Sequence, residues 1–417
     1  MKKLLYLICL ILLITSCNRE KPDVKEKKET EAKSLPSKGE MTILAWYSLP
    51  NAEMTLERFR ELRDCGFTHS FSHHYTDNDM MENALDLAEE VGVKLIIRTP
   101  ELSSEPEETV KRFMNHPATG GYFLMDEPNA DQFEMLAKWA RRIESVDTTH
   151  PCYLNLFPIY VDPNAIKVGS YSEYVDRFDK EVNLPILSFD NYPIIYEDKE
   201  KGTTMVRDNF HENLEVFLKK SQEVNKPFWA FSLAVAHWTY PIPVLAHMRF
   251  QMYSNLAYGA QGLQYFTYWT PETDSFDFHH GPITRDGKRT EVYDDVKTLN
   301  QEIQGLSPVF LGAKVLSVKH TGEVIPSGTT RLETLPSVVK SLKSEGSEGA
   351  IVSHLENGDR EFLVVVNRDI HNKMMLTIDL DAKVERVMKD GSLLPADTYS
   401  STIGVDAGDI IVYSWMK

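Results

Sequence analysis

The chain has 417 residues, a formal net charge of −17, 26% charged and 42% hydrophobic residues, and four cysteines. So acidic a chain argues against nucleic acid as a partner, and against electrostatic docking on an anionic membrane surface. Its length suits one large domain followed by a small one.

The first residues carry the pattern of a secretory signal. MKK precedes the apolar run LLYLICLILLI (residues 4–14), which is too short to cross a membrane as a helix, and TSC follows. The stretch ITSC resembles the lipobox of bacterial lipoproteins. That resemblance implies a signal peptide over residues 1–16, lipidation of Cys17, and a lipid anchor in the cell envelope, at the bacterial outer membrane on its periplasmic or cell-surface side. The alternative is an ordinary or uncleaved signal with an incidental cysteine.

Residues 17–40 are predicted to be a disordered tether. Almost no apolar side chain occurs in NREKPDVKEKKETEAKSLPSKGE (18–40), so this segment has too little surface to bury. Beyond it, Cys65 and Cys152 fit no metal-binding spacing and stand beside apolar residues. We therefore expect buried free thiols rather than a disulfide.

Eight apolar runs with strand character follow, 24 to 41 residues apart, with helical patterns between them. The runs begin near residues 43, 67, 94, 121, 152, 186, 227 and 262. Two intervening helices are predicted to end at Gly66 and Gly92, where a left-handed cap favours glycine, and Asn129 is predicted to cap the fourth helix. No phosphate-binding glycine loop follows any strand, so the pattern predicts a (β/α)8 TIM barrel over residues 41–307 rather than a doubly wound sheet.

The pattern changes after residue 307. Short runs such as GAIVSHL, REFLVVVNR and DIIVYSW alternate with Gly, Asp, Asn and Ser, and almost no helical period remains. Residues 308–417 are therefore predicted to form a small C-terminal antiparallel β-sandwich.

Active sites of such barrels lie at the C-terminal ends of the strands. The predicted strand ends carry carboxylates together with aromatic and polar side chains, the mixture that sugar rings and hydroxyls require. The candidate substrate-binding residues are Trp46, Tyr47, His73, His74, Arg98, Asn155, Tyr192, His237, Trp238 and Trp269. The tryptophans are alternatively core residues. Adjacent histidines on a strand face opposite sides, so we expect no metal and no cofactor.

The stretch GYFLMDEPNADQF (121–133) ends the fourth predicted strand on two adjacent carboxylates, Asp126 and Glu127. In a pleated strand they would point to opposite sides, so both face a pocket only if the chain leaves the pleat, which Pro128 permits. We expect Glu127 to point inward, in register with Phe123 and Met125, with the raised pKa that a general acid requires. Alternatively, Asp126 caps the fourth helix and Glu127 pairs with Arg98.

This segment is similar to one in the (β/α)8 retaining glycosidases that include the β-galactosidases. Those enzymes carry Asn-Glu-Pro at the end of strand four, where this chain has Asp-Glu-Pro (126–128), and ITRDGKRTEVYDDVKTLNQEI (283–303) also looks alike. The resemblance implies a glycoside hydrolase acting on O-glycosidic bonds of an oligo- or polysaccharide, with Glu127 as general acid. It also implies a nucleophilic glutamate on strand seven, yet PFWAFSLAVAHWTY (227–240) has no carboxylate. The candidates for the second group are Asp190, Glu272 and Asp274.

Because the seventh predicted strand has no carboxylate, two alternatives remain open. The Asp126–Glu127 pair resembles that of β-N-acetylhexosaminidases that work by substrate assistance, which implies that Asp126 orients a 2-acetamido group and Tyr192 contacts its carbonyl. The other alternative is a catalytically silent glycan-binding lipoprotein that uses the barrel as a docking surface.

Overall fold

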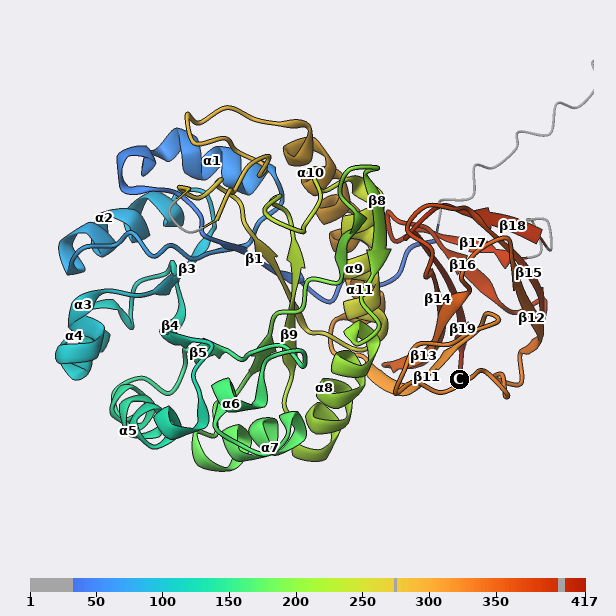
Figure 1. Ribbon diagram of the computed structural model, residues 1–417, viewed down its shortest axis with the longest axis horizontal. Coiled ribbons are helices and arrows are strands. Elements are labelled where there is room, and N and C mark those ends of the chain that lie inside the picture. Colours follow the sequence, from blue (N-terminus) through green and yellow to red (C-terminus); the bar gives the residue numbers. More distant parts are fainter. Residues whose placement is uncertain (1–32, 274–275, 397–401) are drawn as a thin grey trace, which may run out of the picture. The chain divides into compact units, whose positions relative to one another are not determined.

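A closed parallel barrel forms the first part of the fold. The computed structural model describes residues 33–273, 276–396 and 402–417. Eight parallel strands run in the order β5-β4-β3-β2-β1-β10-β9-β6, and a bridge between Leu156 and Phe189 joins the two ends of this order (Figure 1). The strands are β1 (Thr42–Trp46), β2 (His69–Ser70), β3 (Lys94–Ile97), β4 (Thr119–Asp126), β5 (Cys152–Asn155), β6 (Leu187–Phe189), β9 (Phe228–Leu233) and β10 (Gly262–Phe266). The eight predicted strands are confirmed.

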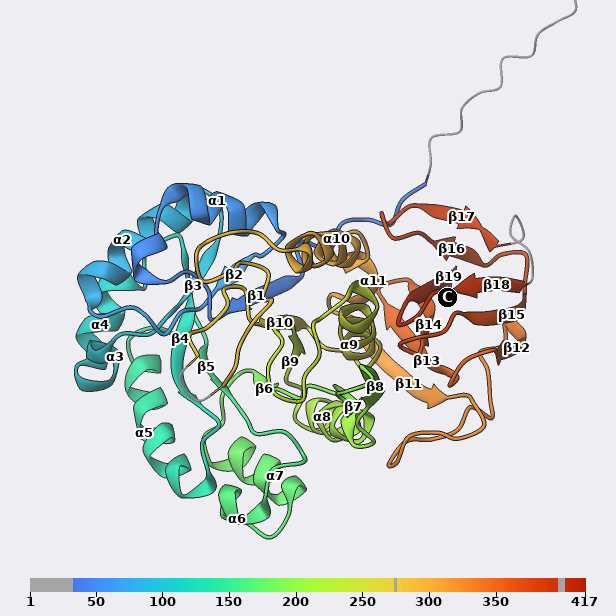
Figure 2. The same cartoon turned by 45° about the horizontal axis from the view of Figure 1, so that its top comes forward.

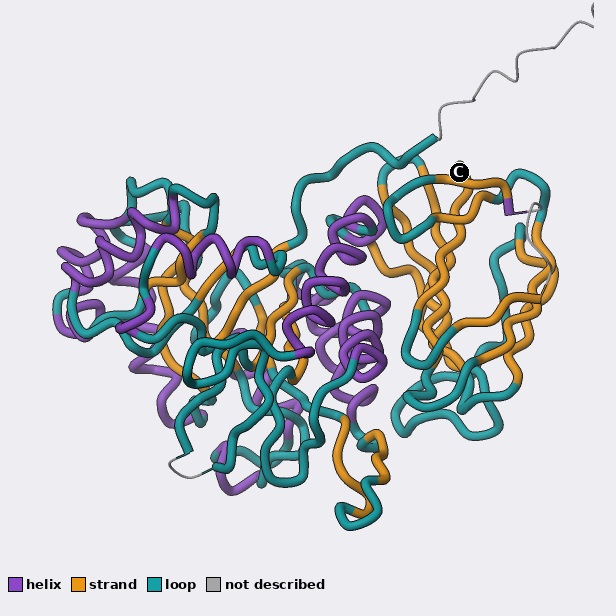
Figure 3. The backbone as a smooth tube through the Cα atoms, turned by 90° about the horizontal axis from the view of Figure 1, so that it is seen from above, coloured by secondary structure: helices purple, strands orange, loops and turns teal. Residues whose placement is uncertain are grey.

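Helices surround this ring of strands (Figure 3). They are α1 (Leu56–Asp64), α2 (Asn78–Glu89), α3 (Pro100–Ser104), α4 (Pro106–Phe113), α5 (Phe133–Glu144), α6 (Pro163–Ile166), α7 (Tyr171–Glu181), α8 (Phe210–Val224), α9 (Leu245–Ala257), α10 (Glu291–Gly305) and α11 (Ser307–Phe310), with 3-10 turns η1 (Asn51–Glu53) and η2 (Ala130–Gln132). Gly66 and Gly92 have φ of +93° and +69°, as their predicted capping positions require. Asn129 caps η2, which leads into α5.

The strands separate two apolar layers. On β4, Phe123 points into the barrel, whereas Tyr122 and Leu124 pack toward the helices. The interior layer consists of Leu44, Trp46, Phe71, Ile96, Phe123, Tyr153, Ile186, Trp229 and Phe231. Large aromatic rings therefore fill the barrel, and any ligand must bind at its mouth.

An antiparallel hairpin follows the sixth barrel strand and was not predicted. It consists of β7 (Ile194–Asp198) and β8 (Thr203–Val206). The Tyr196 N–H donates a hydrogen bond of 2.7 Å to Thr239 O, which attaches the hairpin to the loop after β9. The hairpin thus helps to shape the rim of the barrel.

The C-terminal part is the predicted β-sandwich, with two antiparallel sheets (Figure 2). One sheet has the order β11 (Lys314–His320), β13 (Ala350–Asn357), β14 (Arg360–Asn367), β19 (Ile410–Met416), β16 (Glu385–Val387), β17 (Leu393–Pro395); the other has β12 (Val339–Glu345), β15 (Met374–Leu380), β18 (Thr402–Val405). A separate apolar core, including Leu363 and Trp415, lies between them.

Only the end of the predicted tether is described. Ser34 forms a bridge to Ser392, and the Leu35 N–H donates to Gly391 O at 3.1 Å with its side chain buried. Residues 33–35 therefore pack against the sandwich instead of extending into solvent. The predicted signal peptide, Cys17 and tether residues 18–32 lie outside the described residues.

Two further observations concern cysteines and membranes. Cys65 and Cys152 are buried free thiols, as predicted. Within the described ranges, the structure contains no helix whose length and apolar character would let it span a membrane.

Candidate active site

The backbone turns out of the pleat at the end of β4. Glu127 has a φ of +44°, and its N–H donates a hydrogen bond of 2.9 Å to Asn155 O on β5. The pairing register shifts between Phe123 and Asp126. This departure lets Asp126 and Glu127 lie on the same side, as the adjacent-carboxylate argument required. Met125, expected inward, instead accepts a hydrogen bond from Gln132 Nε2 at 3.3 Å, because the register shift turns it toward α5.

Three carboxylates meet at this end of the barrel. Asp126 and Glu127 come from β4, and Asp190 directly follows β6. Asn155, on β5 between them, donates from Nδ2 to Asp190 Oδ1 at 2.8 Å and to Asp126 Oδ1 at 3.5 Å. Glu127 and Asp190 share a side-chain hydrogen bond. We call Asp126, Glu127 and Asp190 the carboxylate cluster.

Buried polar residues below the cluster fix the Asn155 amide. Ser188 Oγ donates to Asn155 Oδ1 at 3.0 Å, and Gln264 Nε2 donates to Ser188 Oγ at 2.9 Å. Tyr153 donates its hydroxyl proton to Gln264 Oε1. Because the Asn155 carbonyl is occupied, its NH2 group must face the carboxylates. None of these supporting residues was predicted, although Ser188 and Gln264 are polar positions inside otherwise apolar runs.

Electrostatics place the proton of the cluster on Glu127. Burial raises the pKa of Glu127 well above its usual range, and the charges of Asp190 and Asp126 raise it further. Burial, and then the charge of Asp126, also raises the pKa of Asp190, whereas the hydrogen bond from Asn155 lowers it. The shared hydrogen bond therefore runs from a protonated Glu127 to an ionised Asp190.

Asp126 differs from Asp190 in its access to solvent. Its side chain is exposed, whereas Asp190 is 8% exposed. Surrounding protein nevertheless raises the pKa of Asp126 to about 6, mainly through desolvation and against the hydrogen bond from Asn155. Asp126 is therefore a carboxylate that solvent reaches although protein atoms surround much of it.

Several predicted binding residues lie near the cluster. Tyr192 is half-buried beside it, and burial and the charges of Asp190 and Asp126 raise the pKa of its hydroxyl. His73 packs against Trp46 and Phe123 at ring distances of 5.6 and 6.0 Å. Burial, with the charge of Arg98, lowers the pKa of His73 to about 4, so its imidazole is neutral.

Arg98 and His74 belong to the same rim region. Arg98 Nη1 donates to His73 O at 3.1 Å, and His74 lies 5.1 Å from the ring of Tyr47. Among the described residues Glu127 forms no ion pair with Arg98, and Asn129 rather than Asp126 caps the next helical turn. The structural alternative for the carboxylate pair is therefore not supported.

Three other predicted site residues lie elsewhere. Trp46 is 2% exposed and belongs to the barrel interior, and Trp269 is 3% exposed, in the outer core with Arg58 at 5.3 Å from its ring. Neither side chain offers a ring face to a sugar, because both are buried. Glu272 is exposed and pairs with Arg285 at 3.7 Å, not with the cluster. Asp274 lies outside the described residues.

The seventh barrel strand, β9, brings no carboxylate to the rim. His237 and Trp238 follow it; His237 is buried and Trp238 is 52% exposed. Within the described ranges, no group of three or more His, Cys, Asp or Glu side chains could hold a metal ion.

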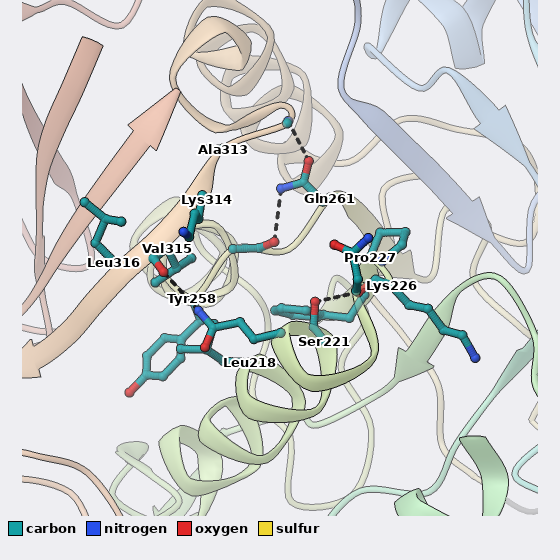
Figure 4. A pocket seen from close by; sticks show the side chains of 15 residues that line it. Leu218, Ser221, Lys226, Pro227, Tyr258, Gln261, Ala313, Lys314, Val315 and Leu316 are labelled. Carbon is teal, nitrogen blue, oxygen red and sulfur yellow. Dashed lines mark hydrogen bonds between the residues drawn. The ribbon is translucent and has the colours of Figure 1, made fainter. Parts of the chain in front are cut away.

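A cavity of about 790 Å³ lies at the opposite end of the barrel, where β9 and β10 begin (Figure 4). Gln261 accepts a hydrogen bond from the Gly312 N–H at 2.7 Å, and Gln222 donates to Val315 O at 2.9 Å. Both side chains belong to the barrel and bind backbone groups at or just before the start of β11. Because its amides are occupied in this way, the cavity is a structural junction rather than a candidate active site.

A family comparison supports the predicted enzyme class. Residues 158–306 match the model of glycosyl hydrolase family 42, described as β-galactosidase. The match supports a glycosidase and covers the second half of the barrel, including Asp190, but not Asp126 or Glu127. No curated protein matches the chain.

Solved structures share the fold at low sequence identity. A β-galactosidase from Bacillus circulans sp. alkalophilus matches with a TM-score of 0.63 and 10% identity, over 90% of this chain and 99% of that one. A catalytic mutant of a family 42 β-galactosidase from G. stearothermophilus matches with a TM-score of 0.56 and 9% identity, over 93% and 100%. A β-galactosidase from Marinomonas ef1 matches with a TM-score of 0.48 and 12% identity over 64% of this chain, which spans only 60% of that protein. The two matches with TM-scores above 0.5, to the proteins from Bacillus circulans and G. stearothermophilus, confirm a TIM barrel followed by a β-sandwich.

Proposed function

We propose that the chain is a glycoside hydrolase that cleaves O-glycosidic bonds of an oligo- or polysaccharide, with Glu127 as the general acid. The observation that carries this proposal is the position of Glu127 directly after β4, where its partly buried side chain shares a hydrogen bond with Asp190 and lies beside Asp126. Burial and two neighbouring carboxylates keep its proton bound near neutral pH, where an ordinary glutamate is ionised. A general acid must hold such a proton until the leaving oxygen takes it.

The spacing of the cluster bears on the second catalytic group. Two-carboxylate glycosidases separate their carboxyl groups by about 5–5.5 Å or about 6.5–9.5 Å, depending on stereochemical outcome. Glu127 and Asp190 share a side-chain hydrogen bond, so their carboxyl groups are adjacent and leave no room between them for the water of an inverting enzyme. Asp190 is therefore better placed to keep Glu127 protonated than to attack a sugar.

This spacing favours substrate assistance as the mechanism. The acetamido oxygen of a 2-acetamido sugar would bond to its own anomeric carbon as the bond to the leaving oxygen breaks and Glu127 protonates that oxygen. Ionised Asp126 would accept the acetamido N–H, and the Tyr192 hydroxyl would donate to its carbonyl. Water, deprotonated by Glu127, would then open the cyclic intermediate. The exposure of Asp126 and its hydrogen bond from Asn155 support this role.

The test of the general acid compares two matched substitutions at the same rim. Glu127→Gln should lower hydrolysis of a responsive chromogenic glycoside by about 10²- to 10⁴-fold. Glu272→Gln should leave turnover unchanged, because Glu272 is exposed and its ion partner is Arg285. Circular dichroism would establish that both variants fold. Equal turnover of Glu127→Gln and wild type would reject the proposal.

A paired panel of chromogenic substrates separates the mechanisms. Each sugar is offered with a 2-acetamido group and with a 2-hydroxyl. Substrate assistance requires turnover of the acetamido member alone. Turnover of 2-hydroxyl sugars, abolished by Asp190→Asn, would favour a conventional two-carboxylate mechanism with a rearranged cluster.

Lipid anchoring through Cys17 is part of the same proposal, and its support is the sequence pattern ITSC. An enzyme anchored in the cell envelope would meet polysaccharide at the cell surface or in the periplasm. Mass spectrometry of the mature N-terminus tests this directly. Acylated Cys17 as the first residue supports the anchor, and an unmodified Cys17 rejects it.

A further inference from the structure

Two aromatic rings are exposed side by side on the loops after β9 and β10. Trp238 is 52% exposed and Phe276 is 37% exposed. Their ring centroids are 4.2 Å apart, with an angle of 30° between the planes. We call this pair the aromatic platform. A single exposed apolar side chain is ordinary, but a packed aromatic pair at a barrel rim is not accounted for by the core.

The backbone holds Trp238 in a costly position. Its φ is +46°, in the left-handed region that a bulky side chain avoids. Its N–H donates to Asp277 Oδ1 at 2.6 Å, and its carbonyl accepts from Lys199 Nζ at 2.8 Å. Lys199 belongs to the turn of the β7–β8 hairpin. Two other segments thus keep this strained residue in place although half of its side chain remains in solvent, so burial alone does not explain the conformation.

A continuous series of rings connects the platform with the carboxylate cluster. Tyr192, beside Asp190, lies 6.0 Å from Tyr240, which lies 4.6 Å from His237. His237 lies 5.8 Å from Phe276, the inner member of the platform. Three ring-to-ring steps thus separate Tyr192, beside the cluster, from Phe276 in the platform, and His237 within the series is buried.

We propose that the aromatic platform is a remote glycan subsite, which binds a sugar residue several units away from the bond that is cleaved. The flat faces of Trp238 and Phe276 suit the C–H faces of pyranose rings. The proposal rests on the proposed glycosidase function and narrows it, because a remote subsite selects a chain of several sugars over a disaccharide. The occupant is a glycan chain that extends over the barrel rim from the cluster to the platform.

The test measures how turnover depends on substrate length. The full chain and its Trp238→Ala and Trp238→Phe variants are assayed on ladders of β-1,4-linked N-acetylglucosamine and of β-1,4-linked galactose, and on an aryl monoglycoside. Trp238→Ala should lower kcat/KM on the longest oligomers about tenfold and leave the aryl glycoside unchanged, and Trp238→Phe should restore most of the loss. Val324→Ala is the control, because Val324 is 74% exposed on the sandwich. Equal loss on short and long substrates, or no loss, would overturn the subsite.

A binding experiment separates failure of the subsite from failure of the hydrolase. If wild type cleaves no glycoside, calorimetry with the same ladders compares wild type with Trp238→Ala. Affinity that rises with length only in wild type supports the subsite although the hydrolase proposal fails. Affinity that is equal in both proteins, or absent for both ladders, overturns it. A wild-type dimer that Trp238→Ala converts to a monomer, with unchanged oligomer turnover, would assign the platform to a second copy of the chain and overturn it as well.

Discussion

Asn155 donates a 2.8 Å hydrogen bond to Asp190, and Asp190 also accepts a hydrogen bond from the protonated Glu127 side chain. The amide stabilises the ionised form of Asp190 because it donates a hydrogen bond to the carboxylate. An ionised Asp190 in turn disfavours loss of the proton from Glu127. The Asn155 amide thus favours the arrangement in which Glu127, rather than Asp190, carries the proton.

Replacing Asp190 by Asn should shift the alkaline limb of the pH profile. The substitution removes the charge that raises the pKa of Glu127, so Glu127 should lose its proton at a lower pH. We expect the alkaline limb of kcat/KM to move down by about one pH unit or more, with activity retained below it. The measurement is kcat/KM between pH 4 and pH 10, with Glu272→Gln as the unshifted control. An unmoved alkaline limb in Asp190→Asn would contradict this assignment.

Replacing Asn155 by Ala should affect the acid limb instead. The Asn155 hydrogen bonds lower the pKa of both Asp126 and Asp190, so their loss should raise both values. Asp126 would then ionise at a pH above its present value of about 6. We expect activity to fall more at pH 6 than at pH 8. A uniform loss at both pH values would show that Asn155 acts only by supporting the fold.

The carboxylate cluster should make the folded state less stable as pH rises. A folded-state pKa raised above the unfolded value of about 4.3 for Glu127 favours folding at low pH, and this contribution is lost as pH rises from that value toward the folded pKa. Glu127→Gln removes the effect. Its Tm should exceed that of wild type by a few degrees at pH 8 and approach it at pH 5. Calorimetry at the two pH values tests this. The prediction is wrong if the Tm of Glu127→Gln exceeds that of wild type by less at pH 8 than at pH 5.

Replacing Gln264 by Leu should destabilise the protein. Gln264 is fully buried and bonds both Ser188 and Tyr153, so an apolar replacement leaves two buried hydroxyls without this partner. We expect a loss of about 1–3 kcal/mol in the free energy of unfolding. Urea denaturation measures it. Gln222→Leu, which removes one bond to a backbone carbonyl in a partly exposed setting, should cost less.

The sequence predicted the barrel because its signals are local. Each strand is an apolar run, and the helix ends at Gly66 and Gly92 depend on one residue type at one position. The β7–β8 hairpin was missed because its short, half-exposed strands have no strong apolar pattern.

The site was predicted only in part because the path of the chain beyond a strand end is not local. Trp46 and Trp238 both stand at predicted strand ends, yet one is 2% and the other 52% exposed. The contact between Glu127 and Asp190 joins β4 and β6, and no pattern within either strand encodes it. The polar support from Ser188 and Gln264 is likewise visible only when separate strands are brought together.

The barrel closes between β5 and β6, directly beside the carboxylate cluster, so a substitution at this position affects both the closure and the site. The seam consists of the Leu156–Phe189 bridge, a 2.8 Å bond from the Leu156 N–H to Ser188 O, and the side-chain bond between Ser188 and Asn155. The Asn155 side chain, which donates to Asp126 and Asp190, therefore also helps to join β5 to β6. A substitution of Asn155 that changes the pKa values of the carboxylates should therefore also weaken the closure between β5 and β6. Faster hydrogen exchange at the Leu156 amide, under conditions where the protein stays folded, would measure this weakening.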